Sequence, residues 1–211
     1  MFQSTFMDTQ TSSLDTLKDI RNMMEKSSRF ISLSGWSGIA AGICGLAGAF
    51  FAWQLLNKQP YGQLDAAAVI ALRRSLIMLA IIVFACAFIT AFVFTYVRSR
   101  RGGTPIWGQT AKRLVWNTML PMIVGGVVIL KLIAVENYAL IVPCALIFYG
   151  LALVNGSKYT LGEVRYIGYI EIILGIINLW YPREWLLLWI IGFGVMHIVY
   201  GILMWWRYER K

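Results

Sequence analysis

The stretch Ser75-LIMLAIIVFACAFITAFVFTY-Val97 decides the fold class, because its 23 residues contain no charged side chain. A helix needs about 20 mostly apolar residues to cross the roughly 30 Å hydrocarbon core of a bilayer. The rest of the chain has the same character. Of its 211 residues, 59% are hydrophobic and only 14% are charged, whereas soluble domains contain about 25% charged residues. The sequence therefore predicts an integral membrane protein.

Six apolar blocks of this kind follow one another along the chain. We predict an all-α, polytopic membrane protein with six transmembrane helices in one domain, residues 30–206. A cytoplasmic segment, residues 1–29, precedes this domain, and a short cytoplasmic tail, residues 207–211, follows it. Pro121 and Pro143 fall inside the third and fourth blocks, where each can kink its helix. The predicted spans are 30–56, 75–97, 114–132, 138–155, 161–180 and 185–206.

The distribution of Lys and Arg predicts the orientation, since basic loops are retained on the cytoplasmic side. With six spans and a cytoplasmic N-terminus, most of the 19 basic residues fall in cytoplasmic segments. We therefore expect a multi-pass membrane protein with both termini in the cytoplasm. The formal net charge of +9 is then explained by topology, with lipid headgroups as its partners. Nucleic-acid binding is not expected.

Residues 11–29 read as an amphipathic helix on the cytoplasmic side. Leu14, Leu17, Ile20 and Met24 recur at helical spacing, and charged residues occupy the other face. One interpretation is a helix that lies in the lipid headgroups. The other is a docking surface for a cytoplasmic protein partner.

Glycines form a stripe on the first predicted span. Gly35, Gly38, Gly42 and Gly45 are spaced by 3, 4 and 3 residues, so they share one face of a helix. Small residues let a second helix approach closely, and Gly38 and Gly42 form a GxxxG motif. The stripe fits either packing within the chain or a homo-oligomer, and spacing does not decide between them.

The last two predicted spans carry polar residues among glycines. Gly168, Glu171, Gly175 and Asn178 lie on one face of the fifth, and the sixth presents Gly194, His197 and Gly201. A lone charged carboxylate near the middle of a bilayer costs about 2.5–3.5 kcal/mol. Glu171 is therefore expected to be protonated, paired or exposed to water. His197, the only histidine in the chain, is its candidate partner.

An antiparallel hairpin that turns near Pro182 and Arg183 would bring this pair together. Its register places Glu171 opposite Gly194 and His197 opposite Gly168. The remaining offset between the two side chains is about 4.5 Å at 1.5 Å per residue. The pair has two interpretations, an ionisable functional site or polar glue between helices.

The residue inventory argues against an enzyme. One histidine cannot provide a bis-histidine haem site or an HExxH zinc site, and the three cysteines fall on different spans without ligand spacing. We therefore predict no catalytic residues, no metal site and no cofactor.

Several stretches resemble a family of uncharacterised integral membrane proteins from Bacteroidota. The resemblance rests on residues 17–35, on the run from Phe148 to Leu161, on the run from Gly168 to Gly175, and on the run from Gly192 to Gly201. It implies an inner-membrane protein and brings no established activity.

Two functions follow as hypotheses. The first is a non-enzymatic regulatory or interaction protein that contacts its partner through residues 11–29. The second is a small proton-linked transporter that uses Glu171 and His197, because ionisable residues inside a membrane often mark such paths.

Overall fold

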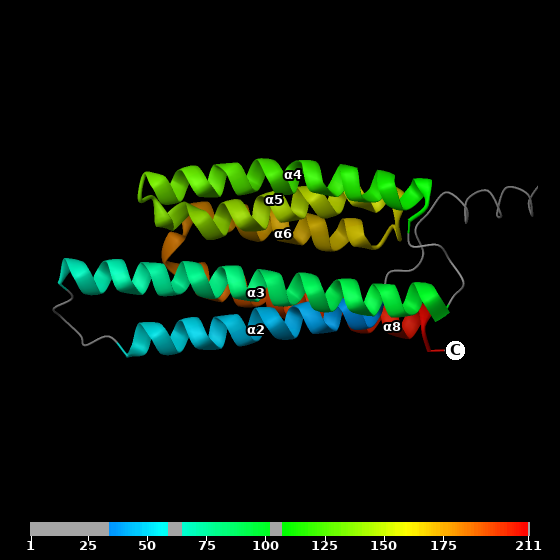
Figure 1. Cartoon of the computed structure of the whole chain (residues 1–211), viewed down its shortest axis with the longest axis horizontal. Coiled ribbons are helices and arrows are strands. Elements are labelled where there is room, and N and C mark those ends of the chain that lie inside the picture. Colours follow the sequence, from blue (N-terminus) through cyan, green and yellow to red (C-terminus); the bar gives the residue numbers. More distant parts are fainter. Residues whose placement is uncertain (1–33, 59–64, 102–106, 211) are drawn as a thin grey trace, which may run out of the picture.

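The computed structural model describes residues 34–58, 65–101 and 107–210, and the regular structure in these ranges is helical (Figure 1). The predicted amphipathic helix at 11–29 and the start of the first predicted span lie outside them. Short 3₁₀ turns, η1 (Tyr138–Leu140), η2 (Ser157–Tyr159) and η3 (Pro182–Glu184), join some of the helices. The helices are α2 (Gly35–Asn57), α3 (Ala66–Arg101), α4 (Gln109–Ala134), α5 (Ile141–Gly156), α6 (Val164–Trp180), α7 (Trp185–Trp189), the π-helical segment η4 (Ile190–Met196) and α8 (His197–Tyr208).

The all-α prediction is confirmed for the described residues. Five helical stretches, Gly35–Asn57, Ala66–Arg101, Gln109–Ala134, Tyr138–Tyr159 and Pro182–Tyr208, are long and apolar enough to cross a membrane. The remaining helix, α6, has 17 residues, about 26 Å at 1.5 Å per residue. This length is at the lower limit for a span, so the count of six spans stays a prediction.

Neither proline ends its helix. Pro121 lies inside α4, which continues to Ala134. Pro143 is the third residue of α5, where a backbone N–H has no partner within the helix and its loss costs little.

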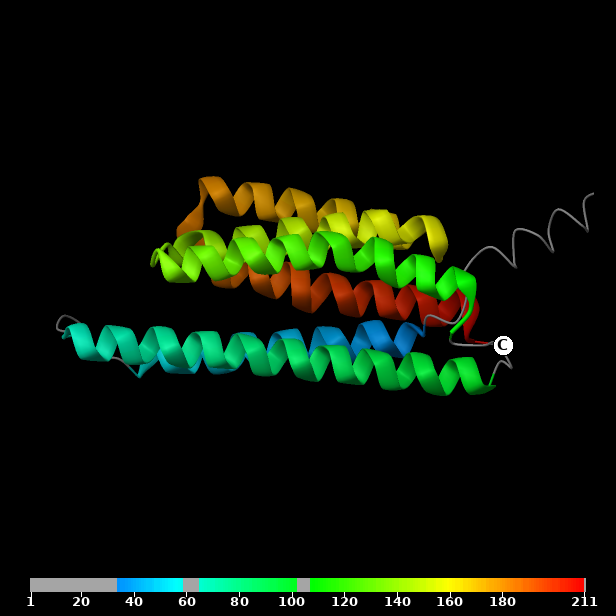
Figure 2. The ribbon, with the colours of Figure 1, turned by 45° about the horizontal axis from the view of Figure 1, so that its top comes forward.

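The helices form two groups that lie side by side (Figures 1 and 2). In one group α5 packs against both α4 and α6, and in the other α2 packs against both α3 and α8. The turn after α6 lies at η3, as expected, but the backbones of α6 and α8 stay apart, and the backbone of α6 comes close to the last segment mainly at α7 and η4. The close packing expected of this hairpin is therefore wrong, because α8 packs against α2.

Glycines explain why α2 and α8 come so close. A Cβ atom on Gly35 would lie 2.5 Å from the carbonyl oxygen of Gly201, and one on Gly201 would lie 2.6 Å from the carbonyl oxygen of Gly35. Gly38 also faces Gly201, while Gly42 and Gly45 meet backbone atoms of Gly194 and Phe193. The stripe on the first span is thus filled by the same chain, which leaves no room there for a second copy.

Glycines also allow the backbones of α5 and α6 to approach closely. A Cβ atom on Gly168 would lie 2.8 Å from the carbonyl oxygen of Gly150, and one on Gly175 would lie 2.9 Å from that of Pro143. Glu171 lies on the same face of α6, between these two glycines, and its carboxyl reaches past α5 to His197 and Gly192.

Most of the described basic residues lie at one end of the bundle, which we call the basic end. Arg98, Arg207 and Arg210 lie at the ends of α3 and α8, and α4 and α6 begin there, as Figure 1 shows. Glu209 ties this end together, since its carboxylate pairs with Arg98 and accepts a 2.5 Å hydrogen bond from the backbone N–H of Gly35. A carboxylate at a helix N-terminus stabilises the helix through its dipole.

Candidate functional site

Glu171 and His197 meet between the two groups of helices. Glu171 is in the middle of α6 and fully buried, and His197, the first residue of α8, is 6% exposed. The Nδ1 atom of His197 lies 3.6 Å from the Oε1 atom of Glu171. This distance is within ion-pair range but too long for a hydrogen bond.

Both ring nitrogens of His197 already have partners. Nδ1 lies 3.0 Å from the carbonyl oxygen of Gly192, which can only accept, so Nδ1 carries a proton. Nε2 lies 2.6 Å from the hydroxyl of Tyr149. A neutral imidazole with its proton on Nδ1 accepts there from the tyrosine hydroxyl, so the geometry satisfies a neutral His197 completely.

Glu171 has no such partners. Neither of its carboxylate oxygens has a hydrogen bond among the described residues. Its Oε2 atom lies against Gly192, since a Cβ atom there would be only 2.5 Å away, and the Leu146 side chain closes the same space. An ionised carboxylate without donors is costly in an apolar interior, so this arrangement suits the protonated form.

The π-helical segment η4 builds one wall of the site. It ends at Met196, directly before His197, and contains Gly192. Wider π-helical turns are rare and occur frequently at functional sites. Here Gly192 supplies the acceptor for His197 Nδ1 and, having no side chain, the space for the Glu171 carboxylate.

The glycines predicted to face the pair do not face it. Gly194 lies against Leu46 of α2, and Gly168 lies against Gly150 and Val154 of α5. That prediction is wrong because it assumed a packed hairpin of regular α-helices. Gly192, two residues earlier, faces Glu171 instead.

Tyr149 of α5 was not recognised from the sequence. Besides its hydrogen bond, its ring stacks on that of His197 with centroids 5.3 Å apart, and Phe193 packs against both rings. Nothing in the spacing of residues around Tyr149 links it to position 197. Only the approach of α5 to η4 does so.

Two further buried polar atoms lack hydrogen bonds among the described residues. They are the Oδ1 atom of Asn178, seven residues after Glu171 on α6, and the hydroxyl of Tyr200, one turn after His197 on α8. Together with the Glu171 oxygens, these atoms are distributed along the lengths of α6 and α8. Buried polar atoms without partners call for an explanation such as an unseen water or a functional role.

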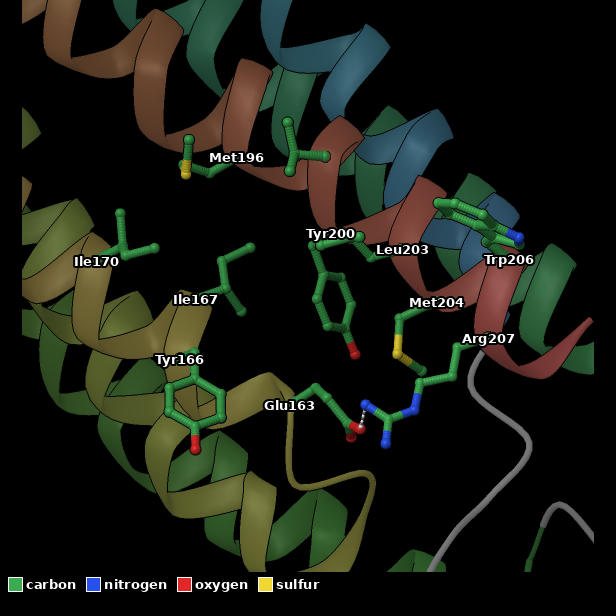
Figure 3. Close-up of a pocket in the computed structure, with 11 residues that line it drawn as sticks. Glu163, Tyr166, Ile167, Ile170, Met196, Tyr200, Leu203, Met204, Trp206 and Arg207 are labelled. Carbon is green, nitrogen blue, oxygen red and sulfur yellow. Dashed lines mark ion pairs between the residues drawn. The ribbon is translucent and has the colours of Figure 1, made fainter.

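A crevice lies between α6 and α8, toward the basic end of the bundle (Figure 3). Its volume is about 500 Å³, and Glu163 and Arg207 lie at one end. Ile170 and Met196, the sequence neighbours of Glu171 and His197, also line it. Figure 3 shows Tyr200 extending from α8 toward the side chains of α6.

The site can hold one proton in two ways. In the first, Glu171 is protonated and His197 is neutral, as the contacts favour. In the second, the proton has passed to the imidazole, and a carboxylate faces an imidazolium 3.6 Å away. No group of three potential metal ligands occurs among the described residues.

Removing the hydroxyl of Tyr149 should change the stability of the protein more than removing the hydroxyl of Tyr200. Tyr149→Phe should lower the free energy of unfolding by about 1–2 kcal/mol, because the buried Nε2 acceptor loses its donor. Tyr200→Phe removes a buried hydroxyl that has no hydrogen bond within the described part of the chain, so it should be neutral or slightly stabilising. Thermal unfolding of both variants in detergent compares the two directly. Equal effects would contradict the hydrogen bond between Tyr149 and His197.

No protein-family model, curated protein or solved structure matches this chain. The resemblance to the Bacteroidota family therefore stays a prediction.

Proposed function

We propose that the protein is a small proton-linked carrier of the bacterial inner membrane, with six spans and both termini in the cytoplasm. Glu171 binds the proton, and His197 and Tyr149 are its partners. One observation carries this proposal. The Glu171 carboxyl is fully buried beside His197, and neither oxygen has a hydrogen bond among the described residues.

Polar glue between helices would look different. A carboxyl that holds two helices together does so by donating or accepting hydrogen bonds across the interface. The described contacts of Glu171 provide none, and the His197 nitrogen that lies 3.6 Å away is already bonded to Gly192. A group that adds little to packing and is costly to bury is more readily explained by a function.

The surroundings of Glu171 supply further polar groups and a moving part. The hydroxyl of Tyr200 lies toward the basic end and the Oδ1 atom of Asn178 toward the other end, and neither has a hydrogen bond among the described residues. Because the backbones of α6 and α8 do not pack closely, their separation can change through the side-chain contacts that join them, Glu171 with His197 and Glu163 with Arg207. Loss of the Glu171 proton would draw His197 Nδ1 away from Gly192 and so shift η4.

The experiment measures this coupling. Spin labels at cysteines replacing Ile173 of α6 and Ile202 of α8, both exposed and outside the crevice, report the separation of the helices. In lipid vesicles we expect their distance to change by about 2 Å or more between acidic and alkaline pH. Glu171→Gln, which keeps the shape but cannot ionise, should abolish the change.

A matched pair of labels provides the control. Cysteines replacing Ile43 of α2 and Ile202 of α8 span the close glycine interface, so their distance should not depend on pH. A pH response of the first pair that persists in Glu171→Gln would contradict the proposal. So would the absence of any response in the wild-type sequence.

The regulatory hypothesis rests on residues 11–29. They lie outside the described ranges, so this function stays a prediction from the sequence alone.

A further inference from the structure

The crevice between α6 and α8 has the length of one leaflet of a bilayer. Along α8 it extends from Met196 to Arg207, about 16 Å at 1.5 Å per residue. Half of a hydrocarbon core of roughly 30 Å is about 15 Å. One end of the crevice is near mid-membrane, at the level of Glu171, and the other is at the basic end.

Apolar side chains form most of the walls. Ile167, Ile170, Val199 and Leu203 line the space between the two helices, with Met196 at its inner end. Ile170, Val199 and Leu203 are 38%, 44% and 56% exposed, so the crevice is open along its side. In a membrane this side faces acyl chains and not water.

The mouth of the crevice holds the Arg207–Glu163 ion pair, and basic residues of the adjoining helix ends surround it. The Nη1 atom of Arg207 lies 3.0 Å from Oε1 of Glu163, and the same oxygen accepts a 2.8 Å hydrogen bond from the hydroxyl of Tyr208. The Arg207 side chain is still 69% exposed, so other N–H groups of its guanidinium remain open to a ligand. The starts and ends of the adjoining helices add Lys158, Arg165 and Arg210.

An aromatic side chain, Trp206, also lies at the mouth of the crevice. Arg210 lies over its ring at 6.0 Å. Tryptophan prefers the boundary between acyl chains and headgroups. The mouth therefore sits where the phosphate of a lipid would lie.

We propose that this crevice binds one acyl chain of an anionic phospholipid, with Arg207 as the contact for its phosphate. The apolar walls, the length and the lateral opening fit the chain, and the basic residues around the mouth fit the negative headgroup. The site does not depend on proton binding by Glu171.

The test measures lipid that stays bound after purification in detergent. Native mass spectrometry counts phosphatidylglycerol or phosphatidylcholine retained by the protein after each lipid is added. We expect one phosphatidylglycerol per chain. Val199→Trp fills the crevice and should lower retention at least about fivefold, whereas Ile202→Trp, on the same helix but outside the lining, should not.

The headgroup is tested separately. Arg207→Gln should weaken retention of phosphatidylglycerol about fivefold, the contribution of one basic residue near an anionic lipid surface. Arg100→Gln, an exposed arginine at the same end on α3, is the control and should have no effect. Because Arg207 is exposed, its variant is expected to fold.

Four outcomes would overturn the proposal. The first is equal retention by Val199→Trp and the wild-type sequence. The second is equal retention of phosphatidylcholine and phosphatidylglycerol. The third is no effect of Arg207→Gln. The fourth is a dimer that Val199→Trp dissociates without any change in bound lipid, which would make a second copy the occupant.

Discussion

Replacing Gly201 by alanine is expected to destabilise the protein by about 3 kcal/mol, at the upper end of the usual cost of overpacking. The added Cβ atom would lie 2.6 Å from both the carbonyl oxygen of Gly35 and the backbone nitrogen of Ile39. Both are main-chain atoms, so no side chain can rotate to make room. The α2 and α8 backbones must separate, and their contact is the largest that α8 makes.

Gly126→Ala is the matched control for this substitution. Gly126 is in the interior of α4, and a Cβ atom there meets nothing within 4 Å. Alanine in an open helical position is more favourable than glycine by about 0.5–1 kcal/mol. Thermal unfolding in detergent should therefore show a loss for Gly201→Ala and a small gain for Gly126→Ala. Equal melting temperatures would contradict the close α2–α8 interface.

Replacing Glu171 by leucine is expected to stabilise the protein by about 1–3 kcal/mol. The carboxyl is fully buried, and both of its oxygens lack hydrogen bonds among the described residues. An apolar side chain of similar size removes the cost of burying these polar atoms while keeping the contact with Leu146 and Gly192. The same variant should lose the pH-dependent change in helix separation.

This second prediction separates function from structure at position 171. Stability gained together with function lost is the pattern expected of a residue retained for its activity. The melting temperature of Glu171→Leu in detergent, beside that of Glu171→Gln, is the measurement. A marked decrease in Glu171→Leu would mean that the carboxyl holds the helices together, and the carrier proposal would lose its main support.

The composition of the candidate site could be predicted only in part. A carboxylate in an apolar run needs a partner, and the chain has a single histidine. The register of an antiparallel hairpin brings this histidine near Glu171, so the two residues could be matched from the sequence. Tyr149 could not be found in this way, because an apolar helix tolerates tyrosine at many positions. The choice of Gly192 over Gly194 depends on the π-helical turn, which shifts the face presented by the last segment.

The lengths of the apolar runs by themselves determined that this chain forms long helices. The spacing of the glycines determined which faces of these helices allow another helix to approach closely. Those properties are local, since they depend on the bilayer thickness and on the 3.6-residue period of one helix. Which glycine face meets which helix was decided only by the tertiary structure. Several small-residue faces compete for partners, and the backbone contacts of α8 with α2 and of α6 with α5 separate α6 from α8. The crevice and the setting of Glu171 follow from that separation.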